Sequence, residues 1–102
     1  MIQEITVKQL KAQIDAGETL KIIDVRSPLE FAGGHVAGAI NIPLETVGSA
    51  LPNIEPTDSV VMICQRGGRS MAACQKVAST YPLLVNVAGG TSAWIDAGYS
   101  VE

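Results

Sequence analysis

The sequence predicts a single α/β domain over residues 1–102, with helices on both faces of a largely parallel sheet. Short apolar runs alternate with segments of helical periodicity along the chain, and this alternation is typical of α/β proteins. The runs are apolar almost throughout, as in strands buried on both faces. A length of 102 residues suits one domain, and an apolar content of 47% is sufficient for a core.

Five apolar runs are the candidate strands. We expect them near residues 2–5, 20–25, 39–42, 59–63 and 83–87. Pro43 ends the third run, and Gly89 with Gly90 follows the last. The first run is weak by itself, whereas the run at 59–63 is the most apolar and leads directly into Cys64. Most of these strands are separated by helical segments, so they are expected to run parallel.

Helix signals lie between these runs. Thr6 with Gln9, and Ser27 with Glu30, form two capping boxes, and Pro28 occupies the first helical position of the second. Helices are expected to begin at both boxes, and the second must be short because two glycines follow it. We further expect a weak helix at 44–50, a helix at 70–80 and a final helix at 91–97.

The helix expected at 70–80 has one apolar face, which should pack on the sheet. Its members are Met71, Cys74, Val77 and Ala78. Cys74 is therefore interpreted as an inert core residue. The alternative is a resolving thiol for an oxidised Cys64.

Composition and charge exclude several classes of function. A net charge of -3 leaves no basic face for nucleic acid. No apolar run approaches the roughly 18 residues of a membrane span. The single histidine and two cysteines have no zinc spacing, so we expect neither a metal nor a cofactor. The first residues lack a signal-peptide pattern, so we expect a cytoplasmic protein.

Functional residues are concentrated in the segment after the most apolar run. Cys64 stands at the carboxyl end of that strand, where ligands bind in open α/β sheets. Gly67 and Gly68 allow the loop to curl with its N–H groups pointing inward, and a helix N-terminus follows. Together with the cations of Arg66 and Arg69, this anion cradle is expected to lower the pKa of Cys64 and make it a nucleophile.

Three blocks in a fixed order cover nearly the whole chain. They are Asp24-Val25-Arg26 with Glu30-Phe31, Gly34-His35 and Gly38 to Pro43; Cys64 to Ser70; and Gly89-Gly90 with Trp94. Together they resemble the rhodanese family of sulfurtransferases in its single-domain form. The resemblance implies a five-stranded parallel sheet, with the reactive cysteine in the loop after the fourth strand.

The resemblance also implies a reaction. The Cys64 thiolate would attack the outer sulfur of thiosulfate or polysulfide and become a persulfide. That sulfur would then pass to cyanide or to a thiol, such as glutathione or a thioredoxin-like protein. The expected substrate-binding residues are Gln65, Arg66, Gly67, Gly68, Arg69 and Ser70. We expect Gln65 to contribute its backbone more than its amide, and we favour a helix-start role for Ser70 over a catalytic one.

Loop length distinguishes sulfur transfer from phosphate hydrolysis. In the cell-cycle phosphatases that resemble rhodaneses, five residues separate the cysteine from the arginine, whereas four separate Cys64 from Arg69. The shorter ring suits a sulfur atom and crowds a phosphate. A phosphatase would also need a general acid, for which Asp24 is the nearest candidate by pattern. We favour an enzyme; a persulfide carrier or regulatory module that acts with a protein partner remains the alternative.

Four further polar residues are expected to support the loop. Asp24, Arg26 and Glu30 are interpreted as an ion-pair network at the sheet edge, with substrate contact as the alternative. His35 is expected to form a structural hydrogen bond, although a Cys–His pair is the alternative. Trp94 is expected to anchor the last helix in the core.

Overall fold

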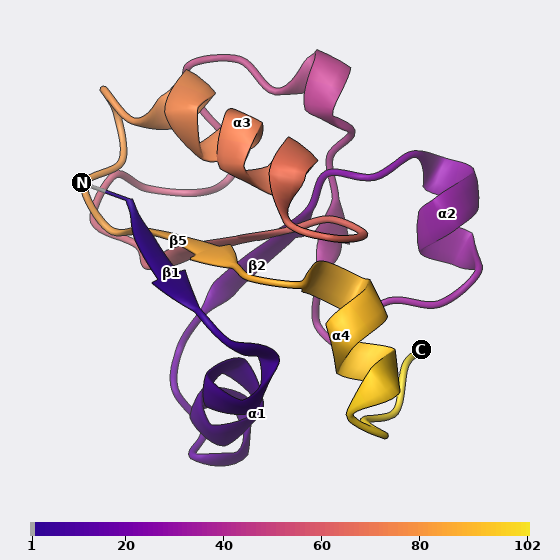
Figure 1. The fold of residues 1–102 in the computed structure, drawn as a ribbon. Helices are drawn as coiled ribbons and strands as arrows, with labels where there is room; N and C mark the ends of the chain where they lie inside the picture. The colour runs from indigo at the N-terminus through magenta and orange to yellow at the C-terminus, as the bar shows by residue number, and fades with distance from the viewer. Residues whose placement is uncertain (1) are drawn as a thin grey trace.

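A twisted parallel sheet forms the central layer of the computed structural model, which describes residues 2–102 (Figure 1). The strands in this range are β1 (Gln3–Ile5), β2 (Lys21–Asp24), β3 (Ile40–Asn41), β4 (Val60–Ile63) and β5 (Leu84–Val87). Their order across the sheet is β1-β5-β4-β2-β3, and each neighbouring pair is parallel. The predicted five-stranded parallel sheet is confirmed for the described residues.

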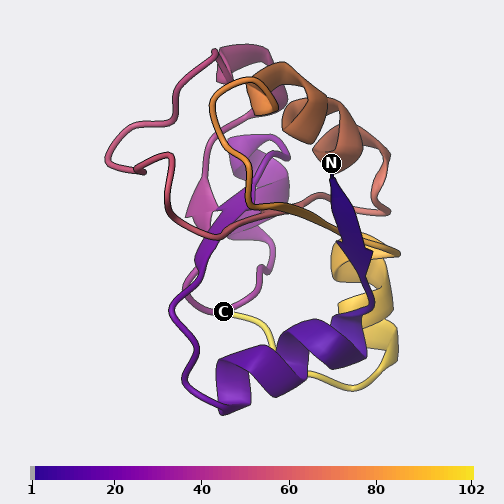
Figure 2. The same cartoon turned by 90° about the vertical axis from the view of Figure 1, so that its left-hand side faces the viewer.

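Helices cover both faces of this sheet (Figures 1 and 2). They are α1 (Val7–Asp15), α2 (Pro28–Ala32), α3 (Gly68–Val77) and α4 (Gly90–Asp96), with the 3-10 turn η1 (Leu44–Thr46). α3 lies on one face, α1 and α4 lie on the other, and α2 lies at the side of the sheet. Both expected capping boxes are present, at Thr6 and at Ser27. Across residues 2–102, no helix is long and apolar enough to cross a bilayer.

The apolar strand residues alternate between the two covered faces. In β4, Val60 and Met62 belong to the cluster beneath α3, whereas Val61 and Ile63 belong to the cluster on the opposite face. This alternation follows from the two-residue period of a strand, and it explains why the run is apolar throughout. Trp94 lies in the second cluster with 3% of its surface exposed, which confirms it as a core anchor.

The prediction of a weak helix at 44–50 is wrong. The chain forms only the turn η1, because Val47 already has an extended backbone with φ -69° and ψ 117°. No side chain caps the turn, and Gly48 follows directly. A β-branched residue next to a glycine gives little support to a longer helix.

The helix expected at 70–80 is shifted toward the N-terminus. It begins at Gly68 because Gly67 adopts a left-handed φ of 108° and turns the chain directly into the helix. Its buried residues are Ser70, Ala73, Cys74 and Val77, whereas Met71 is half-buried and Ala78 is exposed. The buried face of α3 therefore includes Ser70, which was not among the residues expected to face the sheet.

Candidate active site

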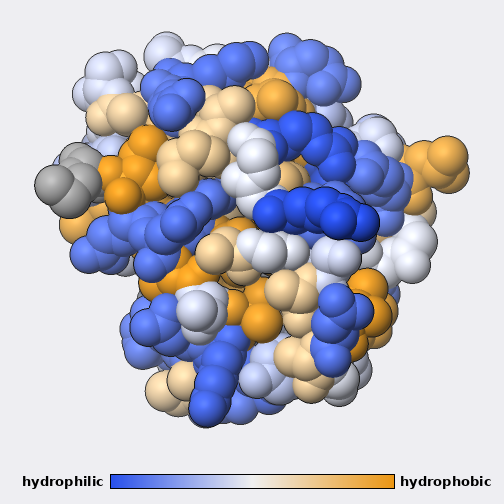
Figure 3. Space-filling view, in the orientation of Figure 1, coloured by the Kyte–Doolittle hydropathy of each residue, from blue (hydrophilic) through white to orange (hydrophobic). Residues whose placement is uncertain are grey.

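Cys64 follows β4 directly, at the carboxyl end of the central strand. Only 1% of its surface is exposed, yet it lies at the base of an open hollow of about 390 Å³. The hollow is lined by Cys64, Gln65, Arg66, Gly68 and Arg69. Figure 3 shows strongly hydrophilic side chains gathered between α3, α2 and α4, the region into which the loop after β4 projects. A small polar reactant could therefore reach the sulfur from this side.

Two hydrogen-bond donors lie against the sulfur of Cys64. The Gly67 N–H is 3.1 Å from Sγ, and the Ser70 hydroxyl oxygen is 3.3 Å from it. Burial by itself would raise the pKa of the thiol. The hydrogen bonds from the Ser70 hydroxyl and from the N–H groups of Ser70, Gly67 and Arg66 outweigh burial, so the pKa of Cys64 lies below its ordinary value.

Ser70 was expected to act at the helix start, and it does lie in the first turn of α3, but it also contacts the cysteine. Because α3 begins at Gly68, Ser70 lies in the first turn with its side chain fully buried against Cys64. The hydrogen bond from its hydroxyl contributes more than any other to lowering the pKa of Cys64. Ser70 therefore acts directly on the sulfur.

Arg69, one of the two cations expected near Cys64, is paired with a carboxylate. Its guanidinium donates to both carboxylate oxygens of Glu30, at 2.8 and 2.9 Å. The hydrogen bonds from Arg69 and from the Ser27 N–H lower the pKa of Glu30 to about 2. Among the described residues, the exposed side chain of Arg66 has no hydrogen-bond partner. The lowering of the Cys64 pKa thus rests on hydrogen bonds more than on free cationic charge.

Asp24 and Arg26 form an ion pair beneath the loop, whereas Glu30, which was expected in the same network, pairs with Arg69. The two side chains are almost fully buried, and Arg26 Nη2 lies 2.7 Å from Asp24 Oδ2. The same guanidinium donates to the Gly34 carbonyl at 2.8 Å and to the Gln65 side-chain oxygen at 3.2 Å. Gln65 therefore uses its amide to join the loop to the segment that follows β2, whereas its backbone was expected to contribute more than its amide.

His35 has contacts that suit a structural role. Its Nδ1 lies 2.8 Å from the Phe31 carbonyl oxygen, and its ring stacks on the Phe31 ring with 3.7 Å between centroids. Its backbone exchanges two hydrogen bonds with Glu102. These contacts hold His35 against α2 and the C-terminal segment. Among residues 2–102, no three His, Cys, Asp or Glu side chains form a candidate metal cluster.

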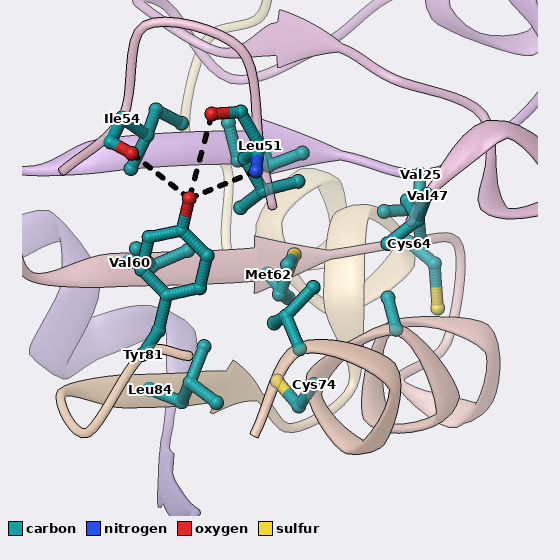
Figure 4. Packing of buried hydrophobic residues seen from close by; sticks show 13 residues of the cluster. Val25, Val47, Leu51, Ile54, Val60, Met62, Cys64, Cys74, Tyr81 and Leu84 are labelled. Carbon is teal, nitrogen blue, oxygen red and sulfur yellow. Dashed lines mark hydrogen bonds between the residues drawn. The ribbon is translucent and has the colours of Figure 1, made fainter. Parts of the chain in front are cut away.

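Cys74 lies in a different environment from Cys64. It is fully buried on the core-facing side of α3, and burial raises the pKa of its thiol to about 12. Figure 4 shows Cys74 beside Met62 and Leu84, with its sulfur directed away from Cys64. These features agree with its interpretation as a core residue.

Asn86 is a site residue that the sequence reasoning missed. It lies in β5 with 1% of its surface exposed. Its Oδ1 accepts a hydrogen bond from the Ser70 hydroxyl, and its Nδ2 lies 3.2 Å from the Gly67 carbonyl oxygen. A signal was present, because a lone amide inside an apolar run must find buried partners.

The start of α4 packs against the backbone of the cysteine loop. The Thr91 N–H donates to the Cys64 carbonyl at 2.9 Å, and the Ser92 N–H donates to the Gln65 carbonyl at 3.0 Å. Gly90 allows this approach, because a Cβ there would lie 2.3 Å from the Cys64 oxygen. Gly90 thus allows the start of α4 to hold the backbone of the cysteine loop in place.

The fold and this loop define an α/β domain with a hydrogen-bonded, acidified thiol at the carboxyl edge of its sheet. The model of the rhodanese-like domain family matches residues 6–97, and the chain belongs to that family.

Relatives of the chain agree with this assignment. It is 36% identical over 93 residues to the putative sulfurtransferase YtwF of Bacillus subtilis, covering 91% of this chain and 90% of that protein. It is 33% identical to the putative sulfur carrier protein YrkF of the same organism, but spans only 51% of that protein's length. A rhodanese-related protein of Thermoplasma volcanium superposes with a TM-score of 0.86 at 32% identity, covering 98% of this chain and 97% of the other.

Proposed function

We propose that the protein is a sulfurtransferase that carries a sulfane sulfur as a persulfide on Cys64. The observation that supports this most directly is the pair of donors at the sulfur. The Gly67 N–H and the Ser70 hydroxyl lie 3.1 and 3.3 Å from Sγ, at the base of a hollow open to solvent. Such donors favour the thiolate, which is the nucleophilic form of a cysteine.

The first half-reaction loads the sulfur. The Cys64 thiolate attacks the outer sulfur of thiosulfate, a new S–S bond forms, and the bond to sulfite breaks with its electron pair leaving on sulfite. A polysulfide reacts in the same way and leaves as a chain shorter by one sulfur. Because Cys64 lines the hollow, the added sulfur has space to extend toward solvent.

The second half-reaction transfers the outer sulfur of the persulfide to an acceptor. A thiolate or cyanide attacks the outer sulfur of the persulfide, and the electron pair of the breaking S–S bond returns to Cys64. The hollow is wide and open, so either a small acceptor such as glutathione or a thioredoxin-like protein can approach. We also propose a cytoplasmic location, because a thiolate nucleophile and such thiol acceptors suit a reducing compartment.

The two arginines that line the hollow are not equally available to bind an anionic donor. Arg66 is exposed at the hollow and is the cation most available to the donor. Arg69 also lines the hollow, but its charge is offset by Glu30. Donor binding is therefore expected to be weak and to depend on ionic strength.

A persulfide carrier is the second candidate function. Similarity to a protein named a putative sulfur carrier favours it, although this chain spans only 51% of that relative. A carrier would acquire a sulfur atom on Cys64 but show negligible turnover without its partner.

Steady-state turnover separates the two candidates. Wild type, Cys64→Ser and Cys74→Ser would be assayed with thiosulfate and either cyanide or glutathione, while the mass of each protein is followed. The enzyme hypothesis predicts turnover in wild type and Cys74→Ser, and none in Cys64→Ser. Sulfur loading without turnover would favour the carrier. Failure of the wild-type protein to take up sulfur from thiosulfate and polysulfide would contradict both.

A further inference from the structure

The side-chain amide of Asn86 has a defined orientation. The Gly67 carbonyl oxygen and the Glu4 carboxylate oxygen lie 3.2 and 3.1 Å from one end of the amide. A carbonyl oxygen can only accept a hydrogen bond, so the NH₂ group must face Gly67. The oxygen of Asn86 must then face the Ser70 hydroxyl, and Ser70 is its donor.

Ser70 therefore has one proton and two acceptors. Its hydroxyl is fully buried, between the Asn86 oxygen and the Cys64 sulfur, 3.3 Å away. A neutral thiol sulfur is a weak acceptor, so a carbonyl oxygen attracts the proton more strongly. A thiolate is a charged acceptor and attracts it more strongly than the carbonyl does.

We propose that Asn86 is a positioning residue that competes with Cys64 for the single hydroxyl proton of Ser70. In the thiol form Ser70 donates to Asn86. When Cys64 loses its proton to water, the Ser70 hydroxyl rotates and donates to the thiolate, and the Asn86 oxygen loses its donor. Ionisation of Cys64 therefore costs the hydrogen bond between Ser70 and Asn86.

The same competition operates during the proposed sulfur transfer, and this part of the inference rests on that proposed function. In a persulfide anion the charge resides on the outer sulfur, and Sγ becomes a neutral inner atom. Ser70 then donates again to Asn86. When the acceptor removes the outer sulfur, the thiolate reforms and the hydroxyl turns back.

Several charged groups near Ser70, Asn86 and Cys64 also influence the ionisation of Cys64. Glu4 on β1 contacts Asn86 directly. Arg69 on α3 is paired with Glu30 and interacts electrostatically with Cys64. Arg66 lines the hollow, and the buried Asp24–Arg26 pair lies beneath the loop. None of these residues is altered in the test below.

The test is a double-mutant cycle on the pKa of Cys64. The rate of alkylation by iodoacetamide, an uncharged reagent, is measured against pH for wild type, Asn86→Leu, Ser70→Ala and the double variant. Asn86→Leu removes the competing oxygen, so the pKa should fall by about half a unit to one unit, the range of one buried hydrogen bond. Ser70→Ala should raise it. In the Ser70→Ala background, Asn86→Leu should leave it unchanged.

Two results would overturn the inference. One is a rise in the pKa of Cys64 in Asn86→Leu; the other is an equal shift with and without Ser70. Either would mean that Asn86 acts through the Gly67 carbonyl and the shape of the loop. Asn86→Ala provides the same test if the leucine variant does not fold, and Tyr81→Phe controls for loss of a buried hydrogen bond elsewhere. The assay needs no turnover, so its outcome is independent of whether Cys64 accepts sulfur.

Discussion

Arg69 and Glu30 form a side-by-side ion pair that joins the first turn of α3 to α2. Two guanidinium nitrogens each contact one carboxylate oxygen, at 2.8 and 2.9 Å, across 39 residues of sequence. Glu30 also accepts from the Ser27 N–H at 3.1 Å and completes the capping box of α2. One carboxylate thus organises a helix start and offsets a charge that faces the cysteine.

Replacing Glu30 by glutamine should strengthen the reaction with an anionic donor. The Glu30→Gln variant is expected to keep the cap at Ser27, because an amide oxygen can still accept the hydrogen bond. The positive charge of Arg69 would then no longer be balanced by a carboxylate. The KM for thiosulfate should fall about two- to fivefold, the range of one exposed ion pair, and should depend more steeply on salt. Steady-state kinetics across ionic strength would measure this.

The matched control is Asp15→Asn, which removes the exposed Lys11–Asp15 pair of α1. Its KM should equal that of wild type. If Glu30→Gln also left the KM and its salt dependence unchanged, the account of Arg69 would be wrong.

The same ion pair should make stability depend on acid pH. Hydrogen bonds from Arg69 and Ser27 lower the pKa of Glu30 from 4.5 to about 2, so the folded state prefers the carboxylate. Its contribution is complete above pH 4.5 and is lost as the pH falls toward 2. The difference in unfolding free energy between wild type and Glu30→Gln should shrink across this window. Urea unfolding at a series of pH values would show it, and a constant difference would contradict the assignment.

Gly90 should be far less tolerant of a side chain than Gly98. Both have positive φ values, 57° and 83°, so alanine strains the backbone at either site. At Gly98 nothing lies within 4 Å of the new Cβ, and strain alone should cost about 1–2 kcal/mol of unfolding free energy. At Gly90 the Cβ would lie 2.3 Å from the Cys64 oxygen, so the loop must move.

Gly90→Ala should therefore lose more stability than Gly98→Ala and should also slow alkylation of Cys64. Gly98→Ala should leave that rate unchanged. Thermal unfolding and alkylation kinetics of the two variants would decide. Equal behaviour of the pair would mean that α4 does not hold the loop.

Tyr81 fixes the long connection between η1 and β4 from within the core. Its hydroxyl accepts from the Leu51 N–H and donates to the Ile54 carbonyl, both at 2.8 Å (Figure 4). Tyr81→Phe leaves a buried N–H and carbonyl without this partner, which should cost about 1–3 kcal/mol of unfolding free energy. Chemical unfolding would measure the loss, while the reactivity of Cys64 should not change. A cost near zero would mean that water replaces the hydroxyl.

Much of the fold was predictable because its signals are local. The apolar runs, the capping boxes at Thr6 and Ser27, and Pro28 at a helix start each act within a few residues. The position of Cys64 after a buried strand was predictable for the same reason. The phase of α3 was not, because it depends on the left-handed conformation of Gly67, which the sequence permits but does not require.

The partners of the site residues were harder to predict because they lie far apart in sequence. The pairing of Asp24 with Arg26 spans two positions and was expected, whereas Arg69 meets Glu30 across 39. Arg69 was therefore assigned to the substrate. Asn86 was overlooked because its role depends on the packing of β5 against the start of α3. Such pairings depend on how the elements pack in three dimensions, and the order of helices and strands in the sequence does not predict individual contacts.

The most direct test of the central claim is the intact mass of the protein after exposure to thiosulfate or polysulfide, followed by peptide mapping. The account predicts that wild type and Cys74→Ser gain the mass of one sulfur atom, located on Cys64. A thiol acceptor should then remove it. Cys64→Ser should gain nothing. A sulfur atom on Cys74, or an unmodified wild-type protein, would contradict the account.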